Sequence, residues 1–456
     1  MQKRTLLKIS IGFSSLFIIE SGFAAGFQIN ELSPTIQATA LADAATASGD
    51  ISGMAYNPAT LATIKGTDIY LGGTVLMPDV GYSNAQATTK SIHTILAPDV
   101  TPVSGVNSED NITPSAFIPD AYIGTSLFPR LTDNNLKIGL GLNAPFGLET
   151  NYNDDWVGRY NALESKIQVM DVFPTIAYQI TPTWSLGASI NFENIDATYS
   201  NDIYSNIGNG FIVSSGNSSL TGSAWGIGYT IGTMYKITPT TTLGADYHSA
   251  VKEGINGTAT IAGNVCILDE EGHCHHPLPN SFFPGEGTDS GQVNLTLPAI
   301  ANLGISQTVG QKLTLMAGAE WTQWDTIPGI DATVSGIGED NTPLNYSNSW
   351  LYSIGSQYQF TPKFSLSGGL AYDETPTNGA YRDARVPGTN RKWITLGCAY
   401  DPTTSLALFA TYEHIFMNDQ NIDLTQQPTP DVSPAHISAD YTGYANIVAG
   451  GLNYTF

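Results

Sequence analysis

From Thr67 to the C-terminus, apolar and polar residues alternate in short runs that are separated by turn residues. The stretch 184–193, for example, reads WSLGASINFE, with an apolar residue at every second position. Successive side chains of a β-strand point to opposite faces, so this pattern predicts a strand with one apolar and one polar face. The last stretch, 448–456, has the same alternation and ends in an aromatic residue. We therefore expect β-strands along this whole part of the chain.

The connections between these runs are alternately short and long. Six short turns are centred on residues 131–134, 181–183, 238–240, 309–312, 361–363 and 401–403. Seven long loops fall near 80–115, 150–165, 200–222, 262–291, 329–347, 376–391 and 419–439. Six turns and seven loops imply fourteen strands, and short turns on one side with long loops on the other are typical of outer-membrane barrels.

The composition favours a membrane barrel over a stack of soluble domains. Charged residues make up 12% of the chain and mean hydropathy is −0.05, as expected when lipid-facing and lumen-facing residues alternate. No apolar run after the N-terminal region approaches the ~20 residues that a membrane helix needs. The length would allow about three domains, but all-β barrels form large single units. The sequence thus predicts an all-β, fourteen-stranded antiparallel transmembrane β-barrel.

The N-terminus has the features of a secretory signal. Lys3, Arg4 and Lys8 precede an apolar stretch, 9–19, that is too short to span a bilayer, and small residues follow it. We expect residues 1–24 to be a signal peptide and the chain to be exported. The remaining chain is then divided into an N-terminal segment, 25–66, and the barrel, 67–456.

The N-terminal segment is rich in Ala, Ser and Thr, and its conspicuous motif is Asn57-Pro58-Ala59. The alanines between 38 and 47 predict a short helix, which Pro58 would bring to an end. Such a helix buries too little apolar area to fold alone. We therefore expect this segment to be a hatch, or plug, inside the barrel lumen.

The formal net charge of −23 disfavours nucleic acid and anionic membrane faces as partners. Acidic outer loops could bridge lipopolysaccharide through divalent cations, or only keep the protein soluble. We expect a monomer in contact with outer-membrane lipids and lipopolysaccharide, without a cofactor.

Cys266 and Cys274 lie eight residues apart in one polar stretch, and an oxidising compartment would let them form a disulfide. His273, His275 and His276 lie beside them, which raises the alternative of a metal site. We favour a loop with a disulfide and no metal.

The pair His248-Ser249 invites a hydrolase interpretation. Adjacent residues in a strand point to opposite faces and cannot be each other's catalytic partners, so we predict no enzymatic activity.

Ordered motifs along the chain give a resemblance to a known family. They begin with Gly26-Phe27-Gln28-Ile29-Asn30-Glu31 and end the first segment with Asn57-Pro58-Ala59. They continue with Ala144-Pro145-Phe146-Gly147-Leu148, Asp155-Trp156-Val157-Gly158-Arg159-Tyr160, Glu320-Trp321-Thr322-Gln323-Trp324 and Ala371-Tyr372-Asp373-Glu374-Thr375-Pro376. The chain resembles the long-chain fatty acid transporters of the Gram-negative outer membrane, a family that includes aromatic hydrocarbon channels. The resemblance covers essentially the whole exported chain.

The resemblance implies a channel for passive uptake of hydrophobic compounds. Molecules would be captured at outer loops, enter a lumenal pocket near Phe27 and Glu31, and leave sideways through a kink in the third strand. Here Pro145, Phe146 and Gly147 would supply that lateral gate, with Gly147 as a hinge at positive φ. Independently, Pro removes a ladder donor and Gly marks bulges, so the trio predicts broken pairing with a neighbouring strand. A harmless bulge near the rim is the alternative.

Capture requires apolar residues on the outer loops. The loops 200–222 and 262–291 correspond to those that form a greasy groove in the family, and they offer Phe211, Ile212, Phe282 and Phe283. Exposed apolar clusters usually mark binding sites, although these residues could also form the loops' own core.

The cargo is less well defined by the sequence. Fatty acid transporters of the family place basic residues in the lumen, but 191–201 and 345–350 contain no Lys or Arg. Arg159, Lys252 and Arg391 are the candidate carboxylate partners. Long-chain fatty acids are the expected cargo, with neutral aromatic or aliphatic hydrocarbons as the alternative. A surface receptor or adhesin is a further alternative, whereas the plug argues against a general porin.

Overall fold

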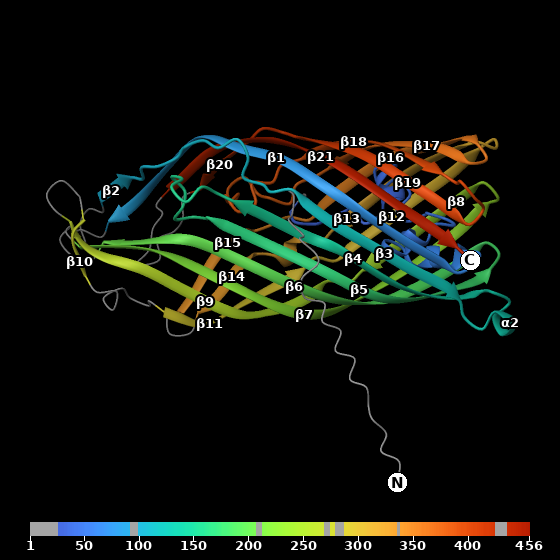
Figure 1. Ribbon diagram of the computed structural model, residues 1–456, viewed down its shortest axis with the longest axis horizontal. Coiled ribbons are helices and arrows are strands. Elements are labelled where there is room, and N and C mark those ends of the chain that lie inside the picture. Colours follow the sequence, from blue (N-terminus) through green and yellow to red (C-terminus); the bar gives the residue numbers. More distant parts are fainter. Residues whose placement is uncertain are drawn as a thin grey trace, which may run out of the picture.

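The structure is a computed structural model that describes residues 26–91, 99–206, 212–268, 274–278, 287–334, 338–424 and 436–456. Its strands form one antiparallel sheet that closes on itself, because β1 pairs with β21 as well as with β3. Figure 1 shows the resulting elongated barrel. The strands are β1 (Asp68–Ser91), β2 (Asp99–Pro102), β3 (Ala116–Ser126), β4 (Leu136–Asn151), β5 (Glu164–Thr181), β6 (Trp184–Asn206), β7 (Ile212–Thr238), β8 (Thr241–His248), β9 (Val251–Leu268), β10 (Cys274–Leu278), β11 (Gly287–Leu297), β12 (Ile300–Val309), β13 (Leu313–Thr322), β14 (Gly329–Val334), β15 (Gly338–Pro343), β16 (Ser349–Thr361), β17 (Phe364–Asp373), β18 (Arg391–Tyr400), β19 (Leu406–Met417), β20 (Gln420–Leu424) and β21 (His436–Thr455).

These segments make up fourteen barrel strands, which confirms the number predicted from the turns. Five barrel strands consist of two segments each, namely β8 with β9, β11 with β12, β13 with β14, β15 with β16, and β19 with β20. The pairing shows the continuity: β7 pairs with both β8 and β9, and β21 pairs with both β19 and β20. In the described part of the chain, the short strand β2 pairs only with β1, and β10 pairs only with β9. Figure 1 places both at the end of the barrel opposite to the C-terminus.

All six predicted short turns join consecutive barrel strands. Thr181-Pro182-Thr183 lies between β5 and β6, and Thr238-Pro239-Thr240 lies between β7 and β8. The first turn also contains the short helix α2 (Pro129–Thr132). These connections are local in sequence, which explains why their turn residues are sufficient to locate them.

Five of the predicted long loops are wrong in their bounds. Within 262–291, β9 continues to Leu268 and β11 begins at Gly287, and 419–439 contains β20 and the start of β21. Most of 200–222 is a ladder, because β6 continues to Asn206 and β7 begins at Ile212. Likewise, β1 continues to Ser91, and β14 with β15 forms a hairpin within 329–347. These outer ladders can consist of polar residues, because they are held together by backbone hydrogen bonds. Apolar side chains are required only where the wall contacts lipid. The barrel wall therefore extends well beyond its apolar part.

The alternation in β6 is confirmed. Ile190 is 51% exposed on the outer surface, whereas the neighbouring Ser189 is 5% exposed and faces the interior. The outward residues Trp184, Leu186 and Phe192 are also exposed, and Ser185, Asn191 and Glu193 are buried. The outer surface in this region is therefore apolar and the interior polar, as a membrane barrel requires.

No helix in the described part of the chain is long and apolar enough to cross a membrane.

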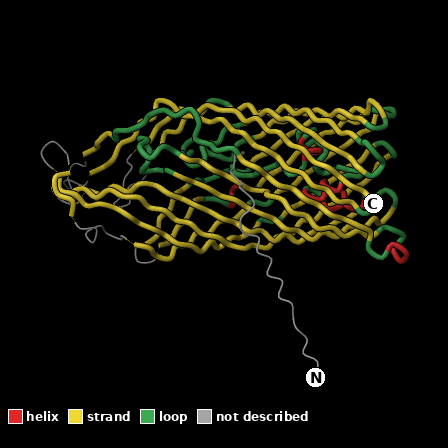
Figure 2. Tube along the Cα trace, viewed as in Figure 1, coloured by secondary structure: helices red, strands yellow, loops and turns green. Residues whose placement is uncertain are grey.

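The N-terminal segment lies within the barrel, where Figure 2 shows its short helices surrounded by strands. They are α1 (Pro34–Gln37), η1 (Ile51–Ala55) and η2 (Pro58–Thr63). The predicted helix between 38 and 47 is wrong, because this stretch forms turns with positive φ at Ala40 and Leu41. Small residues are needed there for close approach to the wall: Thr39 and Ala42 lie directly against Gly355 of β16.

Candidate functional site: the lumenal cavity and the interrupted wall

The Asn57-Pro58-Ala59 motif attaches the N-terminal segment to the wall. Asn57 caps η2 by accepting a hydrogen bond from the Ala59 amide, at 2.9 Å. Its Nδ2 donates to the backbone oxygen of Ala45 at 2.8 Å and to that of Thr233 on β7 at 3.1 Å. A single buried side chain thus links η2, the preceding turns and a barrel strand.

Two glycines of the wall, Gly187 and Gly232, form the notch that accepts this motif. They lie opposite each other on β6 and β7. A Cβ on Gly232 would collide with Oδ1 of Asn57, and one on Gly187 would collide with the backbone of Pro58. Neither glycine was predicted from the sequence, since a glycine in a strand signals close approach but does not identify what approaches.

Asp43 makes the packing of the N-terminal segment dependent on pH. Desolvation by burial raises the pKa of its carboxyl to about 7, although Thr39 donates a hydrogen bond that acts in the opposite direction. Since the folded state holds this proton more tightly than the unfolded state, stability is highest at low pH and falls as the pH rises through about 7. We expect the amides of 36–46 to exchange faster at pH 8 than at pH 5, after correction for intrinsic rates. Asp43→Asn should abolish the difference, and an unchanged difference would contradict this role.

The third barrel strand, β4, is interrupted at the predicted position. Its ladder with β5 shifts register between Asn143 and Phe146. Its ladder with β3 ends at the pair Ala121–Leu142, although β4 continues to Asn151. The wall between β3 and β4 therefore lacks strand pairing beyond Leu142. This is the geometry that a lateral gate needs, and the role of Pro145, Phe146 and Gly147 as that gate stays a prediction.

Backbone groups of the N-terminal segment take the place of the missing pairing. The Ile29 amide donates to the Pro145 oxygen at 2.8 Å, and the Gly147 amide donates to the Phe27 oxygen at 2.9 Å. In lipid, unpaired backbone groups would be costly, so this substitution explains how the interruption is tolerated. The expected positive φ at Gly147 is wrong: the glycines with positive φ in the described part of the chain are Gly26, Gly49, Gly105, Gly287 and Gly310.

Pro119 is a second proline at the interruption. It lies in β3 just beyond the last residue of that strand that pairs with β4. A proline within a strand is normally found at an edge, because it cannot donate to a ladder. Pro119 is therefore a sign of a strand edge in the sequence. It is easily missed, because β3 is a short strand that directly follows the expected long loop 80–115.

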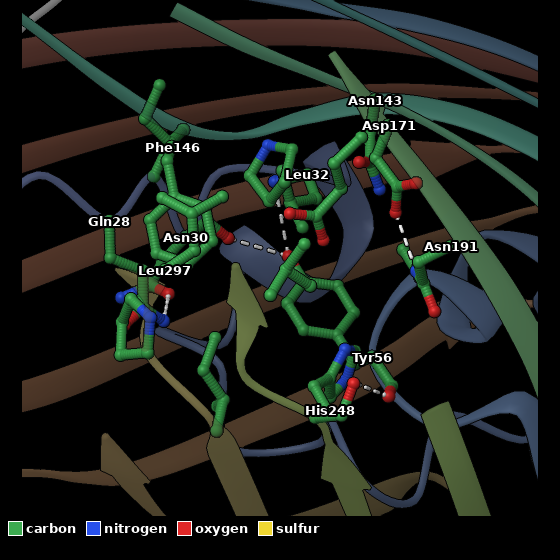
Figure 3. Close-up of a pocket in the computed structure, with 18 of the residues that line it drawn as sticks. Gln28, Asn30, Leu32, Tyr56, Asn143, Phe146, Asp171, Asn191, His248 and Leu297 are labelled. Atoms are coloured by element: carbon green, nitrogen blue, oxygen red, sulfur yellow. Dashed lines mark hydrogen bonds between the residues drawn. The ribbon is translucent and has the colours of Figure 1, made fainter. Parts of the chain in front are cut away.

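A cavity lies beside the interruption, between the N-terminal segment and the strands (Figure 3). Its volume is about 40 Å³. Its lining combines apolar and polar side chains from β4, β5, β6, β8, β9, β11, β12 and β13. They include Gln28, Asn30, Leu32, Tyr56, Asn143, Pro145, Phe146, Asp171, Asn191, Glu193, His248, Val251, Leu297, Ile300 and Glu320.

Hydrogen bonds hold part of this polar lining in place. Asn191 donates to Oδ2 of Asp171 at 2.6 Å, a bond that Figure 3 marks. Nε2 of His248 donates to the backbone oxygen of Tyr56 at 2.7 Å, and its Nδ1 lies 3.1 Å from Oγ1 of Thr230. His248 thus links β8 to both the N-terminal segment and β7.

The predicted pocket residues Phe27 and Glu31 do not line this cavity, although Gln28, Asn30 and Leu32 between and beside them do. Phe27 packs against Trp324, with ring centroids 4.9 Å apart, and against Phe146, at 5.9 Å. The side chain of Glu31 accepts a hydrogen bond from the Asn30 amide at 3.0 Å. Ile29 also lines the cavity, so these contacts, and not the alternation of a strand, set Phe27 and Glu31 apart.

We accordingly expect Phe27→Ala to loosen the N-terminal segment rather than to weaken binding in the cavity. Truncating a buried Phe costs about 3–5 kcal/mol, so amide exchange at 27–33 should rise by about tenfold or more. The affinity for a cavity ligand should change by less than about twofold, as measured by titration. A large loss of affinity with unchanged exchange would return Phe27 to the binding site.

The three candidate carboxylate partners lie elsewhere. Arg159 is 3.6 Å from Asp202 in the outer part of the barrel, and the exposed Lys252 follows the buried Val251, so it lies on the outward face of β9. Arg391 lines a separate small recess and is paired with Asp373, which accepts from its Nε at 2.9 Å. None of the three belongs to the cavity lining.

Several predictions lie outside what the structure describes. Phe211, Phe282 and Phe283 are not among the described residues, and the side chains of Ile212, Cys266 and Cys274 are not described either. The backbone register pairs Cys274 with Leu268 and Cys266 with Pro277. Among the described residues, no three His, Cys, Asp or Glu side chains form a group that could hold a metal ion.

The expectation that His248 and Ser249 point to opposite faces of one strand is wrong, because β8 ends at His248 and both residues line the cavity. Their hydrogen bonds nevertheless lead to different partners, since Oγ of Ser249 accepts from the Tyr229 amide at 2.9 Å.

Comparison with known proteins gives matches along almost the whole chain. The sequence profile of the outer membrane protein transport protein family (OMPP1/FadL/TodX) matches residues 15–456. Outer membrane protein P1 of Haemophilus influenzae is 25% identical over 470 residues, which cover 95% of each chain. The long-chain fatty acid transport protein of Escherichia coli K12 is 20% identical over 454 residues, which cover 94% of this chain and 95% of that protein.

Two solved structures share the fold. A Pseudomonas aeruginosa FadL homologue superposes with a TM-score of 0.81 at 20% identity, covering 94% of this chain and 99% of the other. The toluene transporter TbuX of Ralstonia pickettii superposes with a TM-score of 0.63 at 19% identity, covering 94% and 100%.

Proposed function

Because the chain belongs to the outer membrane protein transport protein family (OMPP1/FadL/TodX), we propose that it is a channel for passive uptake of hydrophobic compounds through the interrupted wall between β3 and β4. It is a β-barrel of the Gram-negative outer membrane, and its relatives are transport proteins, which supports a non-enzymatic role. The observation that carries the proposal is the end of β3–β4 pairing directly beside the lumenal cavity. Asn143, Pro145 and Phe146 belong to both features.

The route begins at the outer loops, as the resemblance implies, and leads through the cavity to the lipid. We expect the N-terminal segment to close the lumen below the cavity. Its residues 27–29 lie along the edge of β4. A small shift of these residues would connect the cavity to the membrane. A hydrophobic molecule gains by entering lipid directly, because each buried CH₂ contributes about 0.8 kcal/mol.

The sequence favours long-chain fatty acids as the cargo, and the name of the Escherichia coli relative agrees with it. The name of the Ralstonia relative agrees with the alternative, a neutral hydrocarbon. Among the described residues, the cavity lining contains carboxyl groups and no Lys or Arg, which favours the alternative, since a buried carboxylate needs a partner.

Uptake into cells tests the proposal. The chain would be produced in an Escherichia coli strain that lacks its own long-chain fatty acid transport protein, and uptake of labelled oleate and labelled dodecane would be measured. We expect dodecane uptake to exceed that of cells with an empty vector. If neither compound enters faster, the chain is not such a channel.

A further inference from the structure

A row of polar side chains crosses three strands on the interior face beside the cavity. Asn143 on β4 lies opposite Asp171 on β5, and Asp171 lies opposite Glu193 on β6. All three are buried, and all three line the cavity. Like charges directly opposite each other in a sheet are destabilising, so this arrangement is not explained by stability.

The row has hydrogen-bond acceptors that nothing in the described structure satisfies. Oε2 of Glu193 and Oδ1 of Asn143 have no hydrogen-bond partner, although the two side chains are only 7% and 2% exposed. A buried acceptor without a partner costs free energy, because its hydration has been lost. This side of the cavity is therefore ready to accept hydrogen bonds.

Three potential donors around the cavity are already engaged. Nε2 of His248 donates to Tyr56 and lies 3.5 Å from Asp246, and the Asn191 amide donates to Asp171. The Gln28 amide donates to Asn30 at 2.6 Å and to Glu320 at 2.7 Å. A ligand carboxylate would thus meet Asp171 and Glu193 without a Lys or Arg to pair with, since the lining contains neither.

Apolar side chains also line the cavity. Phe146, Val251, Leu297 and Ile300 line it, and Phe146 belongs to the interrupted stretch of β4. The cavity thus offers apolar side chains to a hydrocarbon tail, one of them at the interruption, and hydrogen-bond acceptors to a polar group.

We propose that the cavity selects hydrophobic molecules whose polar end donates hydrogen bonds and carries no negative charge, namely long-chain amines and alcohols, with Glu193 and Asn143 as acceptors. This inference rests on the proposed function, since it assumes that cargo passes through the cavity. It goes beyond that function by assigning the head-group chemistry to particular residues. Ammonium gains most, because a charge-assisted hydrogen bond to a carboxylate is about twice as strong as a neutral one.

The test compares four ligands with the same chain length. Dodecylamine, dodecan-1-ol, dodecanoate and dodecane would displace the fluorescent probe 1-aminoanthracene from the full-length protein in lipid nanodiscs. We expect the amine to bind at least tenfold more tightly than dodecanoate, with the alcohol in between. In Glu193→Gln, amine affinity should fall about tenfold and dodecanoate affinity should rise severalfold, whereas dodecane should be unaffected.

Two further variants make the result specific. Asp171→Asn should act in the same direction as Glu193→Gln, which guards against a folding defect in either one. Asp120→Asn removes another buried carboxyl without a hydrogen-bond partner that does not line the cavity, so it should leave the order of affinities unchanged. Equal or tighter binding of dodecanoate by the unmodified protein would overturn the inference and leave the channel function intact. Failure of all four ligands to bind would overturn the proposed function as well.

Discussion

Replacing Pro145 by Thr and Gly147 by Val should lower uptake of a hydrophobic substrate by about tenfold or more. Pro145 has no amide hydrogen with which to pair, and Val at 147 favours extended strand geometry. Together the two substitutions should allow β4 to pair with β3 beyond Leu142, where their ladder now ends. Residues 27–29 would then lose their place along β4. Uptake of labelled dodecane into cells would report the closure.

A second measurement must show that the barrel of the double variant is folded. Heat-resistant migration on gels should persist, because the ladders around the rest of the barrel are unchanged. Pro78→Thr is a matched control, since Pro78 lies in β1 within its continuous ladder with β21. This control should transport normally. Normal uptake by the double variant would mean that cargo passes down the lumen past a moving N-terminal segment, and the lateral route would be wrong.

The strands and turns could be predicted because their signals are local. The alternation in 184–193 follows from the two faces of a strand, and turns such as Thr181-Pro182-Thr183 follow from the conformations of three or four residues. The interruption at Pro145 was also predictable, since the missing donor is a property of one residue. Its partner Pro119 carries the same signal, although it was not predicted.

The N-terminal segment could not be predicted in the same way. Its alanines suggested a helix, since Ala has the highest intrinsic helix propensity. In the structure, contact with the wall overrides that propensity, and positive φ at Ala40 and Leu41 allows the backbone to lie against wall glycines such as Gly355. Which glycine meets which residue depends on the closure of the whole barrel.

The cavity depends on register, which the sequence does not specify between distant strands. Asp171 and Glu193 are ordinary lumen-facing residues when each strand is taken alone. Only the pairing of β5 with β6 brings their carboxyls face to face, and only the N-terminal segment encloses them. The same limitation applies to Phe27 and Glu31, which the sequence predicts in place of Gln28 and Asn30: which side chains of this segment meet the cavity depends on its contacts with distant strands.

Deleting 27–54 should leave a folded barrel that leaks small polar solutes. The wall is closed by hydrogen bonds between its own strands, including those between β1 and β21, and the segment takes the place of a strand only along 145–147 of β4. The interior face is polar and can be hydrated once the segment is absent. Liposomes that contain the deletion variant should therefore swell in isotonic sugar, whereas liposomes with the intact protein should not.

A single substitution tests whether displacing the N-terminal segment, without removing it, is enough to open the lumen. Gly232→Val places a branched side chain where Oδ1 of Asn57 now lies, so the anchor of the segment should be expelled although the chain remains complete. We expect this variant to leak as well, but less than the deletion. Gly368→Val is a matched control, since a Cβ on Gly368 of β17 would make only ordinary contacts with residues of β18, away from the segment. If the deletion variant folds and its permeability equals that of the intact protein, the lumen is closed by the strands and outer loops, and the N-terminal segment is not a plug.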